Sequence, residues 1–223
     1  MARFFETFNV VEQDGNWTSG YVFDTFSGTL NHGVVDICAP TKVDAPADGV
    51  LGREAHIFAF MAHGKVPTRC APPEFEAAAM QIVKDSTEYH VTNVLWNGIG
   101  TQGYDYSLKS EEVEVVTAQA SPYATLGAVL SKAYEKSPEL KPVIHLGWES
   151  AMALQLGLNT IGLPYVIGPG YPPGAVAVTG AVRVQLTPGR FTTSVDPDDN
   201  RKYVEGERLC SIELDPLQAV RAE

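Results

Sequence analysis

The clearest alternation of hydrophobic and polar positions lies near the C-terminus. Between Val176 and Leu186 the even positions are apolar, apart from Gly180, and the odd positions hold mainly small or polar residues. This period of two is the pattern of a half-buried strand, and Gly180 keeps its phase, so we expect one continuous strand. A turn-forming run at 196–200 follows, and residues 210–214 then alternate again. The two segments together predict a long antiparallel hairpin.

Helical periodicity begins at Pro73. The apolar residues after it form one stripe, and two early glutamates suit the first turn of a helix. We expect this helix to run from Pro73 to Tyr89, or as far as Val94, and to terminate at Asn97-Gly98. It is the longest helix that the sequence predicts.

A second helix is followed by a unit of strand, helix and strand. Ser121 suits the N-cap of the second helix, which stops before Pro138. A third helix is predicted from Trp148 to Leu156, between short apolar runs at 143–146 and 163–167. This alternation indicates an α/β unit, but the pattern leaves open whether its two strands are parallel.

Residues 1–70 contain short strand-like segments and no sustained helical periodicity. The segments are Trp17–Phe26, Val34–Cys38 and His56–Met61, and clusters of Gly, Pro and Asp separate them. So few strands are only marginally stable as an independent unit. We therefore expect residues 1–70 to gain their burial against another surface.

The composition suggests an intracellular globular protein. A chain of 223 residues with 44% hydrophobic residues is long enough to form a core. The three cysteines, Cys38, Cys70 and Cys210, are widely spaced, which favours a reducing compartment over a disulfide framework. The start of the chain lacks a signal-peptide pattern and no long apolar window follows, so we expect neither secretion nor a membrane-spanning segment.

The charge argues against one class of function. Proteins that bind nucleic acid through phosphate contacts rely on Lys and Arg to displace counterions, whereas this chain has a net charge of −11. Its 16 Lys and Arg are scattered, and Arg201-Lys202 is the only adjacent pair. We interpret these residues as solvated surface charge.

No motif predicts a metal site or a catalytic site. The five histidines include no pair at helical spacing, and His56 and His63 lack a nearby cluster of acids or thiols. His145 lies in an apolar run, where it is either a general base or a histidine hydrogen-bonded at a strand end, and we favour the second. Neither a nucleophile elbow nor a phosphate-binding P-loop occurs. We predict no catalytic, cofactor-binding or metal-binding residues.

The segment Gly168–Gly174 superficially resembles a glycine-rich nucleotide-binding loop. Its glycine spacing is wrong, it contains three prolines, and it leads into a strand instead of a helix. We therefore interpret it as a rigid connection. The acidic residues at 111–114 suit an exposed sheet edge, and those at 196–199 suit a turn.

Three segments, in this order, resemble one protein family. Residues 76–98 end in VLWNG, and residues 121–146 lead into PVIHLG. Residues 164–207 begin with PYVIGPGYPPGAVAVTGAVRVQL and continue into NRKYVEGERL. These segments resemble the major capsid proteins of tailed bacteriophages that infect actinobacteria, which have the Hong Kong 97 fold.

The resemblance implies an α+β fold in four parts. Residues 1–70 would form an N-terminal arm and an extended β loop, and residues 71–110 a peripheral domain with a long spine helix on a sheet. Residues 111–175 would form an axial α/β domain, and residues 176–223 a long β hairpin that returns to the peripheral domain. The arm and loop would then reach across a neighbouring subunit.

The resemblance also implies a function without catalysis. The chain would assemble with itself into hexamers and pentamers of an icosahedral phage head, in the host cytoplasm, and enclose double-stranded DNA with weak, non-specific contacts. Separate scaffolding, portal and decoration proteins are its candidate partners, and no membrane or cofactor is involved. Some members of the family join a lysine to an asparagine. Lys42, Lys65 and Asn200 are residues of these types, but we predict no such bond.

Three alternatives stay open. An encapsulin-like nanocompartment shell would share the fold and enclose a cargo enzyme. A cytosolic α/β enzyme or small-molecule-binding protein would use His145 and the Gly168–Gly174 segment. A tail-tube or head-decoration protein would also be rich in strands and self-associating.

Overall fold

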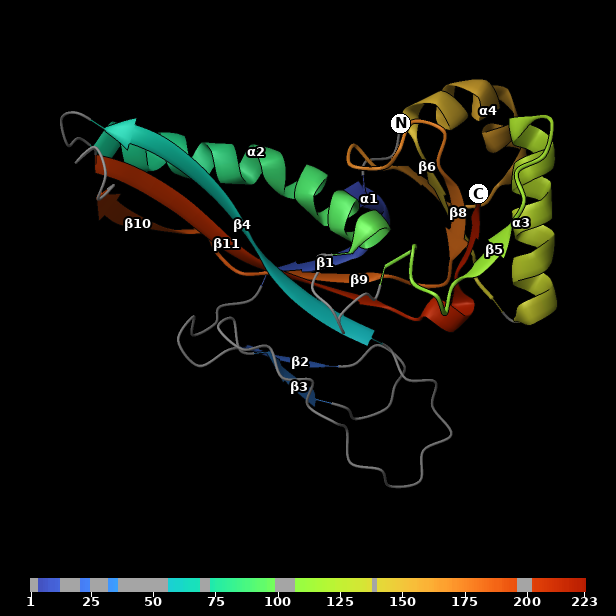
Figure 1. The fold of residues 1–223 in the computed structure, drawn as a ribbon, viewed down its shortest axis with the longest axis horizontal. Helices are drawn as coiled ribbons and strands as arrows, with labels where there is room; N and C mark the ends of the chain where they lie inside the picture. Colours follow the sequence, from blue (N-terminus) through green and yellow to red (C-terminus); the bar gives the residue numbers. More distant parts are fainter. Residues whose placement is uncertain are drawn as a thin grey trace.

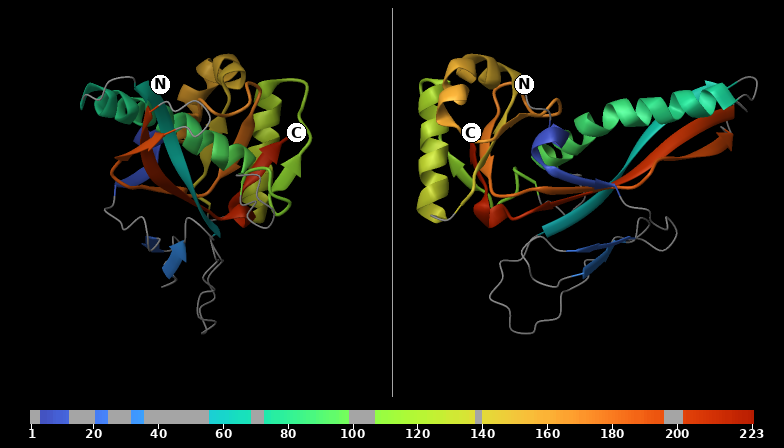
Figure 2. Two further views of the ribbon diagram at one scale, coloured as in Figure 1. Left: turned by 60° about the vertical axis from the view of Figure 1, so that its left-hand side comes forward. Right: turned by 180° about the vertical axis from the view of Figure 1, so that it is seen from behind.

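The molecule is elongated, with a long limb at one end and a compact part at the other (Figure 1). The limb is a long helix lying on a sheet, and the compact part is a second sheet covered by two shorter helices (Figures 1 and 2). The computed structural model describes residues 4–12, 21–24, 32–35, 56–68, 73–98, 107–137, 140–195 and 202–223.

A five-stranded sheet, here called the long sheet, runs from the limb toward the compact part. Its strands are β1 (Asn9–Glu12), β4 (His56–Thr68), β9 (Arg183–Leu186), β10 (Arg190–Val195) and β11 (Lys202–Leu214). On one side, β11 pairs antiparallel with β4 along all 13 of its residues. On its other side, β11 pairs antiparallel first with β10 and then with β9. β1 pairs in parallel with β9.

Helix α2 (Pro73–Asn97) lies along the long sheet and contacts β4, β10 and β11 (Figure 1). The predicted long helix is confirmed, and it continues past Val94 to Asn97. Gly98 then adopts a left-handed backbone conformation with φ of 76°, which glycine tolerates because it has no Cβ. Its N–H bonds to the Val94 carbonyl at 2.8 Å, which closes the last helical turn.

The second sheet, here called the compact sheet, also has five strands. In spatial order they are β5 (Glu114–Val116), β12 (Val220–Ala222), β8 (Val176–Thr179), β6 (Val143–Leu146) and β7 (Tyr165–Ile167). Helix α4 (Trp148–Ile161) connects β6 to β7, and these two strands are parallel. The sequence left this pairing open. β5 lies at the sheet edge, which confirms the exposed edge expected near residues 111–116.

Local capping features mark the start of α3 and the end of α4, the two helices of the compact part. α3 (Pro122–Lys136) starts after Ser121, whose hydroxyl accepts a hydrogen bond from the Ala124 amide, as predicted for an N-cap. α4 starts at the expected Trp148 but runs beyond the predicted end to Ile161. Gly162 ends it in a left-handed conformation with φ of 70°.

The expected continuous strand from Val176 to Leu186 is wrong. The first four residues form β8 in the compact sheet, and residues 183–186 form β9 in the long sheet. The chain crosses between sheets at Gly180, where an added Cβ would lie 2.1 Å from the Gln218 side-chain oxygen. The hairpin prediction is confirmed only for its second half, because β9 pairs antiparallel with β11 whereas β8 pairs with β6 and β12.

Two hydrophobic cores lie on opposite faces of the compact sheet. The compact core lies under α3 and α4, and the junction core lies between the compact sheet, α2 and the long sheet. β6 shows the division, since Ile144 and Leu146 belong to the compact core while the register places His145 on the other face. Buried members of the junction core from α2, β9 and β11 are Val91, Val94, Leu95, Trp96, Val184, Leu186, Cys210, Ile212 and Leu214.

The N-terminal part contributes strands to two sheets. β2 (Tyr21–Asp24) and β3 (His32–Val35) form an antiparallel pair. β2 lies within the expected Trp17–Phe26, β3 overlaps only the first two residues of the expected Val34–Cys38, and β4 extends the third segment. β1 and β4 pair inside the same chain. The expectation that residues 1–70 find their burial on a neighbouring copy therefore applies only to residues 13–55, most of which lie outside the described ranges. The domain boundaries stay a prediction.

Candidate functional site

The candidate site is the junction between the compact sheet and α2, where a buried histidine joins three parts of the chain. His145 is fully buried on β6. Its Nδ1 lies 2.8 Å from the Tyr171 hydroxyl, and its Nε2 lies 2.8 Å from the Thr179 hydroxyl on β8. The Phe8 ring stacks on the imidazole at a centroid distance of 5.5 Å and an interplanar angle of 20°. The site thus links the N-terminal segment to the compact sheet.

The hydrogen bonds assign the tautomer of His145. The single hydroxyl proton of Thr179 is donated to the Gly180 carbonyl at 2.8 Å, so this hydroxyl accepts from His145. The proton of the neutral imidazole therefore sits on Nε2, and Nδ1 accepts from the Tyr171 hydroxyl. The favoured interpretation of His145, a histidine hydrogen-bonded at a strand end, is confirmed.

Burial sets the protonation states at the junction. It lowers the pKa of His145 from 6.5 to about 3, because the interior disfavours the charged imidazolium. Burial also raises the pKa of Tyr171 well above its usual value of 10. Both groups are neutral near pH 7, and a general base with so low a pKa and no exposed surface is poorly suited to take a proton from a substrate.

The Gly168–Gly174 segment fixes the compact part onto α2. The Gly170 amide donates to the Thr92 hydroxyl at 2.9 Å, and a Cβ at this glycine would lie 2.4 Å from the Asn93 amide nitrogen. Only glycine allows two backbones to approach so closely. The Tyr171 ring packs at 5.3 Å from that of Trp96. The segment is thus a rigid connection, as predicted.

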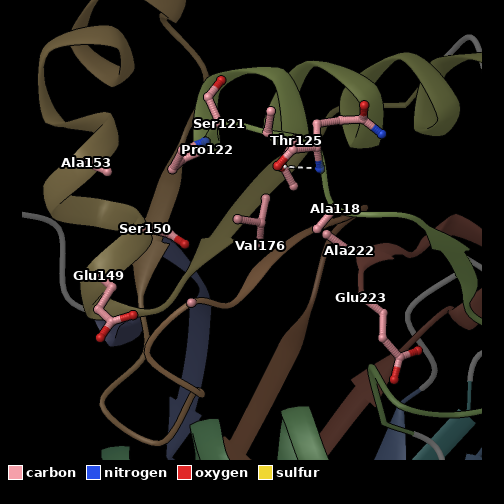
Figure 3. Close-up of a pocket in the computed structure, with 13 residues that line it drawn as sticks. Ala118, Ser121, Pro122, Thr125, Glu149, Ser150, Ala153, Val176, Ala222 and Glu223 are labelled. Carbon is pink, nitrogen blue, oxygen red and sulfur yellow. Dashed lines mark hydrogen bonds between the residues drawn. The ribbon is translucent and has the colours of Figure 1, made fainter.

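A groove of about 450 Å³ lies between the first turns of α3 and α4 (Figure 3). Val176, Ala222 and Glu223 also line it, and the exposed charges there are the carboxylates of Glu149 and Glu223. The amides that begin α4 donate to the Pro173 carbonyl, at 2.9 and 3.3 Å. Because these amides are already satisfied, the start of α4 offers no anion site to the groove.

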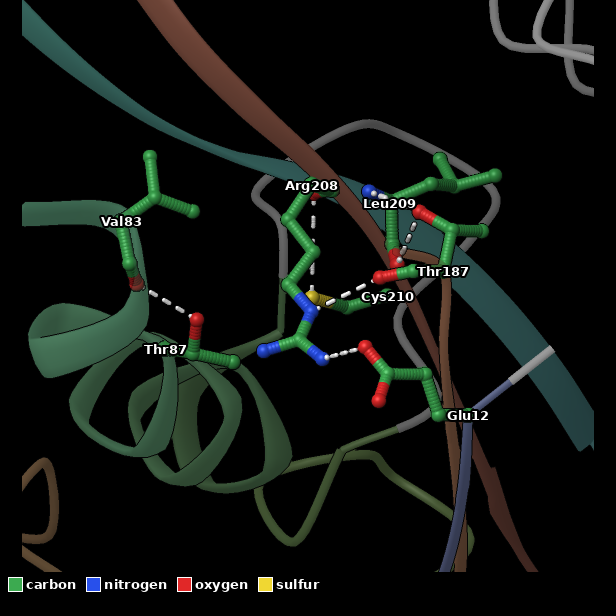
Figure 4. A network of polar contacts seen from close by, with 7 residues as sticks. All are labelled: Glu12, Val83, Thr87, Thr187, Arg208, Leu209 and Cys210. Atoms are coloured by element: carbon green, nitrogen blue, oxygen red, sulfur yellow. Dashed lines mark hydrogen bonds and ion pairs between the residues drawn. The ribbon is translucent and has the colours of Figure 1, made fainter. Parts of the chain in front are cut away.

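A polar network connects β1 to the centre of the long sheet (Figure 4). The Arg208 guanidinium on β11 pairs with the Glu12 carboxylate at 2.6 Å and donates through Nε to the Thr187 carbonyl at 2.8 Å. The arginine side chain is 14% exposed and the glutamate 59%. The pair holds the end of β1 against the sheet and contains no nucleophile or metal-ligand cluster.

The remaining residues that the sequence singled out do not converge. His56 and His63 lie seven positions apart on β4, where only the backbone is described. His90 lies on α2, with its ring edge-on to Tyr89. Within the described ranges no group of three His, Cys, Asp or Glu residues is placed to bind a metal ion.

Several of the singled-out residues lie outside the described ranges, and others have only their backbone described. The first group comprises residues 196–199, Lys42, Asn200, Cys38 and Cys70. The second group comprises Lys65 on β4 and His32 on β3. Cys210 is buried, and its thiol lies 3.8 Å from the Arg208 carbonyl oxygen. Among the described helices, none combines the length and apolar composition that a membrane crossing requires.

Sequence reasoning missed most partners of His145. Phe8 and Tyr171 lie far from it along the chain, and Thr179 was assigned to a different strand arrangement. The available signal was Tyr171, a single aromatic residue inside a rigid run of Gly and Pro. The Glu12–Arg208 pair has no local signal, since 196 positions separate its members.

Comparisons with known proteins were made at the levels of sequence and structure. No family model matches the sequence, and no curated protein matches it. Among solved structures, the virus-like particle from Pyrococcus furiosus is 10% identical with a TM-score of 0.56, covering 100% of this chain and 92% of that chain. The procapsid of satellite phage P4, which includes the size determination protein Sid, is 14% identical with a TM-score of 0.52, covering 100% and 94%.

A third solved structure, from Gordonia phage Cozz, is 13% identical with a TM-score of 0.50, covering 97% of this chain and 84% of that chain. All three likenesses extend over nearly the whole of this chain. They therefore include both sheets and α2, which lies along the long sheet. With α2 as its spine helix, the chain has the Hong Kong 97 fold, as the sequence resemblance implied.

Proposed function

We propose that this chain is the repeating structural subunit of a closed protein shell. The observation that carries the proposal is the likeness, over 97–100% of this chain, to chains of a virus-like particle, a procapsid and a phage. A fold can host many functions, so the shape of the molecule has to support the same conclusion. Its two ends differ in a way that suits a shell subunit.

The limb extends away from the junction core as one helix on strands up to 13 residues long. Such an extended element has a large surface for its volume, and contacts with neighbouring copies bury part of it. Subunits that repeat one contact around a closed ring gain many weak contacts together. An elongated tile of this kind is suited to close packing with its own copies.

We further propose that the shell is a phage head of hexamers and pentamers that encloses double-stranded DNA. The sequence resemblance to actinobacteriophage capsid proteins supports this, as does the likeness to a Gordonia phage chain. The net charge of −11 disfavours tight binding to packaged DNA. Catalysis has no part in this proposal. The location would be the virion, after assembly in the host cytoplasm, with separate scaffolding, portal and decoration proteins as candidate partners.

An encapsulin-like compartment is the second candidate. It is favoured by the likeness to the Pyrococcus furiosus virus-like particle, with a TM-score of 0.56 over all of this chain. Both candidates require a shell made from many copies of this chain. They differ in the contents, which are DNA in the first and a cargo protein in the second.

Electron microscopy of the purified full-length chain tests the proposal. We expect closed, roughly spherical shells, with sedimentation far above that of a 24.1 kDa subunit. Nuclease treatment and mass spectrometry of the contents then distinguish a phage head from a compartment with cargo. A stable monomer or dimer under every assembly condition would overturn the proposal, and tubes would point to a tail protein.

A deletion tests the role of residues 13–55. Because β1 and β4 belong to the long sheet, the deletion must keep both and join Glu12 to His56 by a flexible Gly/Ser linker. We expect the variant to keep a cooperative unfolding transition, followed by circular dichroism, and to lose shell assembly. The matched control replaces residues 138–139, between α3 and β6, with Gly/Ser and keeps residues 13–55. Normal shells from the deletion variant would show that this segment is not an assembly element.

A further inference from the structure

The N-terminal segment, residues 4–12, attaches to the body at separate points. It consists of α1 (Phe4–Thr7), Phe8 and β1. Phe8 is 7% exposed and belongs to the junction core, and Phe5 packs against the same core. β1 adds four residues to the edge of the long sheet. We call residues 4–12 the latch segment.

The attachment along β1 is weak. β1 pairs only with β9 within the described part of the chain, in parallel and over four residues. Parallel pairing is slightly less stable per residue than antiparallel pairing. The Glu12–Arg208 ion pair holds its far end, but the glutamate is 59% exposed, so water and salt screen the interaction. Docking of the latch segment therefore depends strongly on Phe8 and the core beneath it.

Phe8 lies directly on the imidazole of His145, which is fully buried. Undocking of Phe8 removes one covering side chain from this ring and lets water approach it. Both ring nitrogens already have neutral partners, the hydroxyls of Tyr171 and Thr179. In the docked state an added proton on Nδ1 would meet the Tyr171 hydroxyl, which has to turn its own proton away into the core.

We propose that residues 4–12 form a proton-sensitive latch, in which Phe8 docks on neutral His145 and acidification of the medium releases the segment through protonation of that histidine. The released segment leaves β9 as the sheet edge and uncovers the junction between the compact sheet and α2. The device is a property of the single chain and does not depend on the proposed shell.

His145 is the group that takes up the proton, because the side chains around it are uncharged. Its neighbours across the sheet are Val166 on β7 and Ala177 on β8, both uncharged. The loop contributes the Tyr171 phenol, whose pKa is raised by burial, so it stays neutral. α2 contributes Trp96, 5.3 Å from the Tyr171 ring, and the latch segment contributes Phe8.

Burial alone accounts for the lowered pKa of His145, about 3 in the docked state. The latch segment itself carries two acidic residues, Glu6 and Glu12, and Glu12 pairs with Arg208. The experiment tests the carboxylate of this pair separately.

The docked and released states differ in their affinity for a proton on His145, and this difference sets the direction of the pH effect. Docked His145 stays neutral down to about pH 3, whereas an imidazole in water takes up a proton below about pH 6.5. Protons therefore bind the released state preferentially, and the docked state loses population as the pH falls. Full exposure of the imidazole shifts the ratio of released to docked segment by about thirty-fold between pH 7.5 and pH 5.

Hydrogen exchange with mass spectrometry on the full-length chain tests the latch. Amides of residues 9–12 are followed at pH 7.5 and pH 5, with labelling times scaled for the intrinsic pH dependence of exchange. We expect their protection to fall by more than five-fold and up to about thirty-fold at pH 5. Peptides from α2 and β8 should keep their protection. A smaller change, or an equal loss in all three regions, would overturn the proposal.

Four variants test whether His145 causes the pH dependence of protection at residues 9–12. His145→Gln, which has no charge at any pH, should abolish the pH dependence, whereas His90→Gln, a change of a partly exposed histidine, should keep it. Glu12→Gln should also keep it, because the ion pair is not the titrating group. If His145→Gln fails to fold, Phe8→Ala decides. It should release residues 9–12 already at pH 7.5 and lose most of the pH dependence, and unchanged protection in this variant would overturn the proposal.

Discussion

The compact sheet and the limb are stabilised in different ways. The compact sheet is buried on both faces, with α3 and α4 over the compact core and the junction core on the other side. All four residues of β8 are buried. The limb has one helix, α2, along strands that continue well beyond the junction core. Stability is therefore concentrated in the compact part, while the limb depends on strand pairing and on one helix.

Helix α2 belongs to both regions, and its two halves show the difference. Near its C-terminus, Val91, Leu95 and Trp96 are buried in the junction core. In the limb, Val83 is fully buried but Ile82 beside it is 45% exposed. The same helix thus joins a region with a core on each side of its sheet to a limb in which it lies along the long sheet. Four predictions test this comparison.

The largest effect is expected from Leu154→Ala in the compact core. Leu154 is fully buried on α4, and its truncation leaves a cavity, which costs about 2–5 kcal/mol of unfolding free energy. Urea unfolding of the unassembled subunit measures the change. Met152→Ala on the same helix is the control, because Met152 is 62% exposed and should change stability by less than about 0.5 kcal/mol. Equal losses for the two variants would contradict the proposed concentration of stability.

The next effect is expected from Gly170→Ala, which separates the two regions. The new Cβ would meet the Asn93 amide nitrogen and the Tyr89 carbonyl oxygen, at 2.4 and 2.5 Å, and neither backbone atom can turn away. Overpacking of this kind costs about 1–3 kcal/mol. Hydrogen exchange should show loss of protection at the junction while α3 and α4 stay protected.

Gly174→Ala is the control for this change, since nothing lies within 4 Å of a Cβ at that position of the same loop. It should leave protection at the junction unaltered. A Gly170→Ala protein with normal stability would mean that the compact part and α2 do not need close backbone contact. Equal loss of protection in α4 would mean that the two regions unfold as one unit.

Acidification should destabilise the chain through His145. The unfolded state binds a proton below the ordinary pKa of 6.5, whereas the folded state resists protonation down to about 3. Stability present above pH 6.5 is therefore lost progressively as the pH falls toward 3, by at most about 2 kcal/mol at pH 5. Urea unfolding at pH 7.5 and pH 5 measures this loss. His145→Gln should remove that part of the pH dependence, and an unchanged slope in the variant would assign it to other groups.

The smallest effect is expected from the N-cap of α3. Ser121→Ala removes the acceptor of the Ala124 amide and should cost about 1 kcal/mol. Ser131→Ala on the exposed surface of the same helix is the control, and it should stabilise by a few tenths of a kcal/mol because alanine has the higher helix propensity. Thermal unfolding measures the change in stability of each variant. A destabilised Ser131→Ala protein would contradict the local account of this helix.

The sequence predicted the helices well, because their signals are local. Ser121 marks the start of α3 and Asn97-Gly98 marks the end of α2, in agreement with the structure. α4 continued past its expected end to Ile161 because the residue that ends it is Gly162, beyond the apolar pattern that we used. Helix ends that depend on one left-handed glycine are visible in the sequence only if that glycine is recognised.

The path of the chain at Gly180 could not be predicted from alternation. Val178 enters the compact core and Val182 the junction core, so even positions are buried on both sides of the crossing. Ala177 and Thr179, assigned to the solvent face of a half-buried strand, are also fully buried. A period of two reports that a strand exists, but it does not report which sheet contains the strand.

The candidate site was only partly predictable. The sequence singled out His145 and the Gly168–Gly174 segment, and the structure places both at the junction. The stacking of Phe8 depends on contact between residues 137 positions apart, which no local pattern encodes.

Strand β11 has a mechanical consequence. It is the single backbone that pairs with β4, β9 and β10, and its interstrand hydrogen bonds lie perpendicular to its length. A force applied at the limb tip along this strand is shared by many bonds in shear, whereas a force that peels β4 sideways breaks them one after another. The limb should therefore transmit tension to the junction and fail first by peeling.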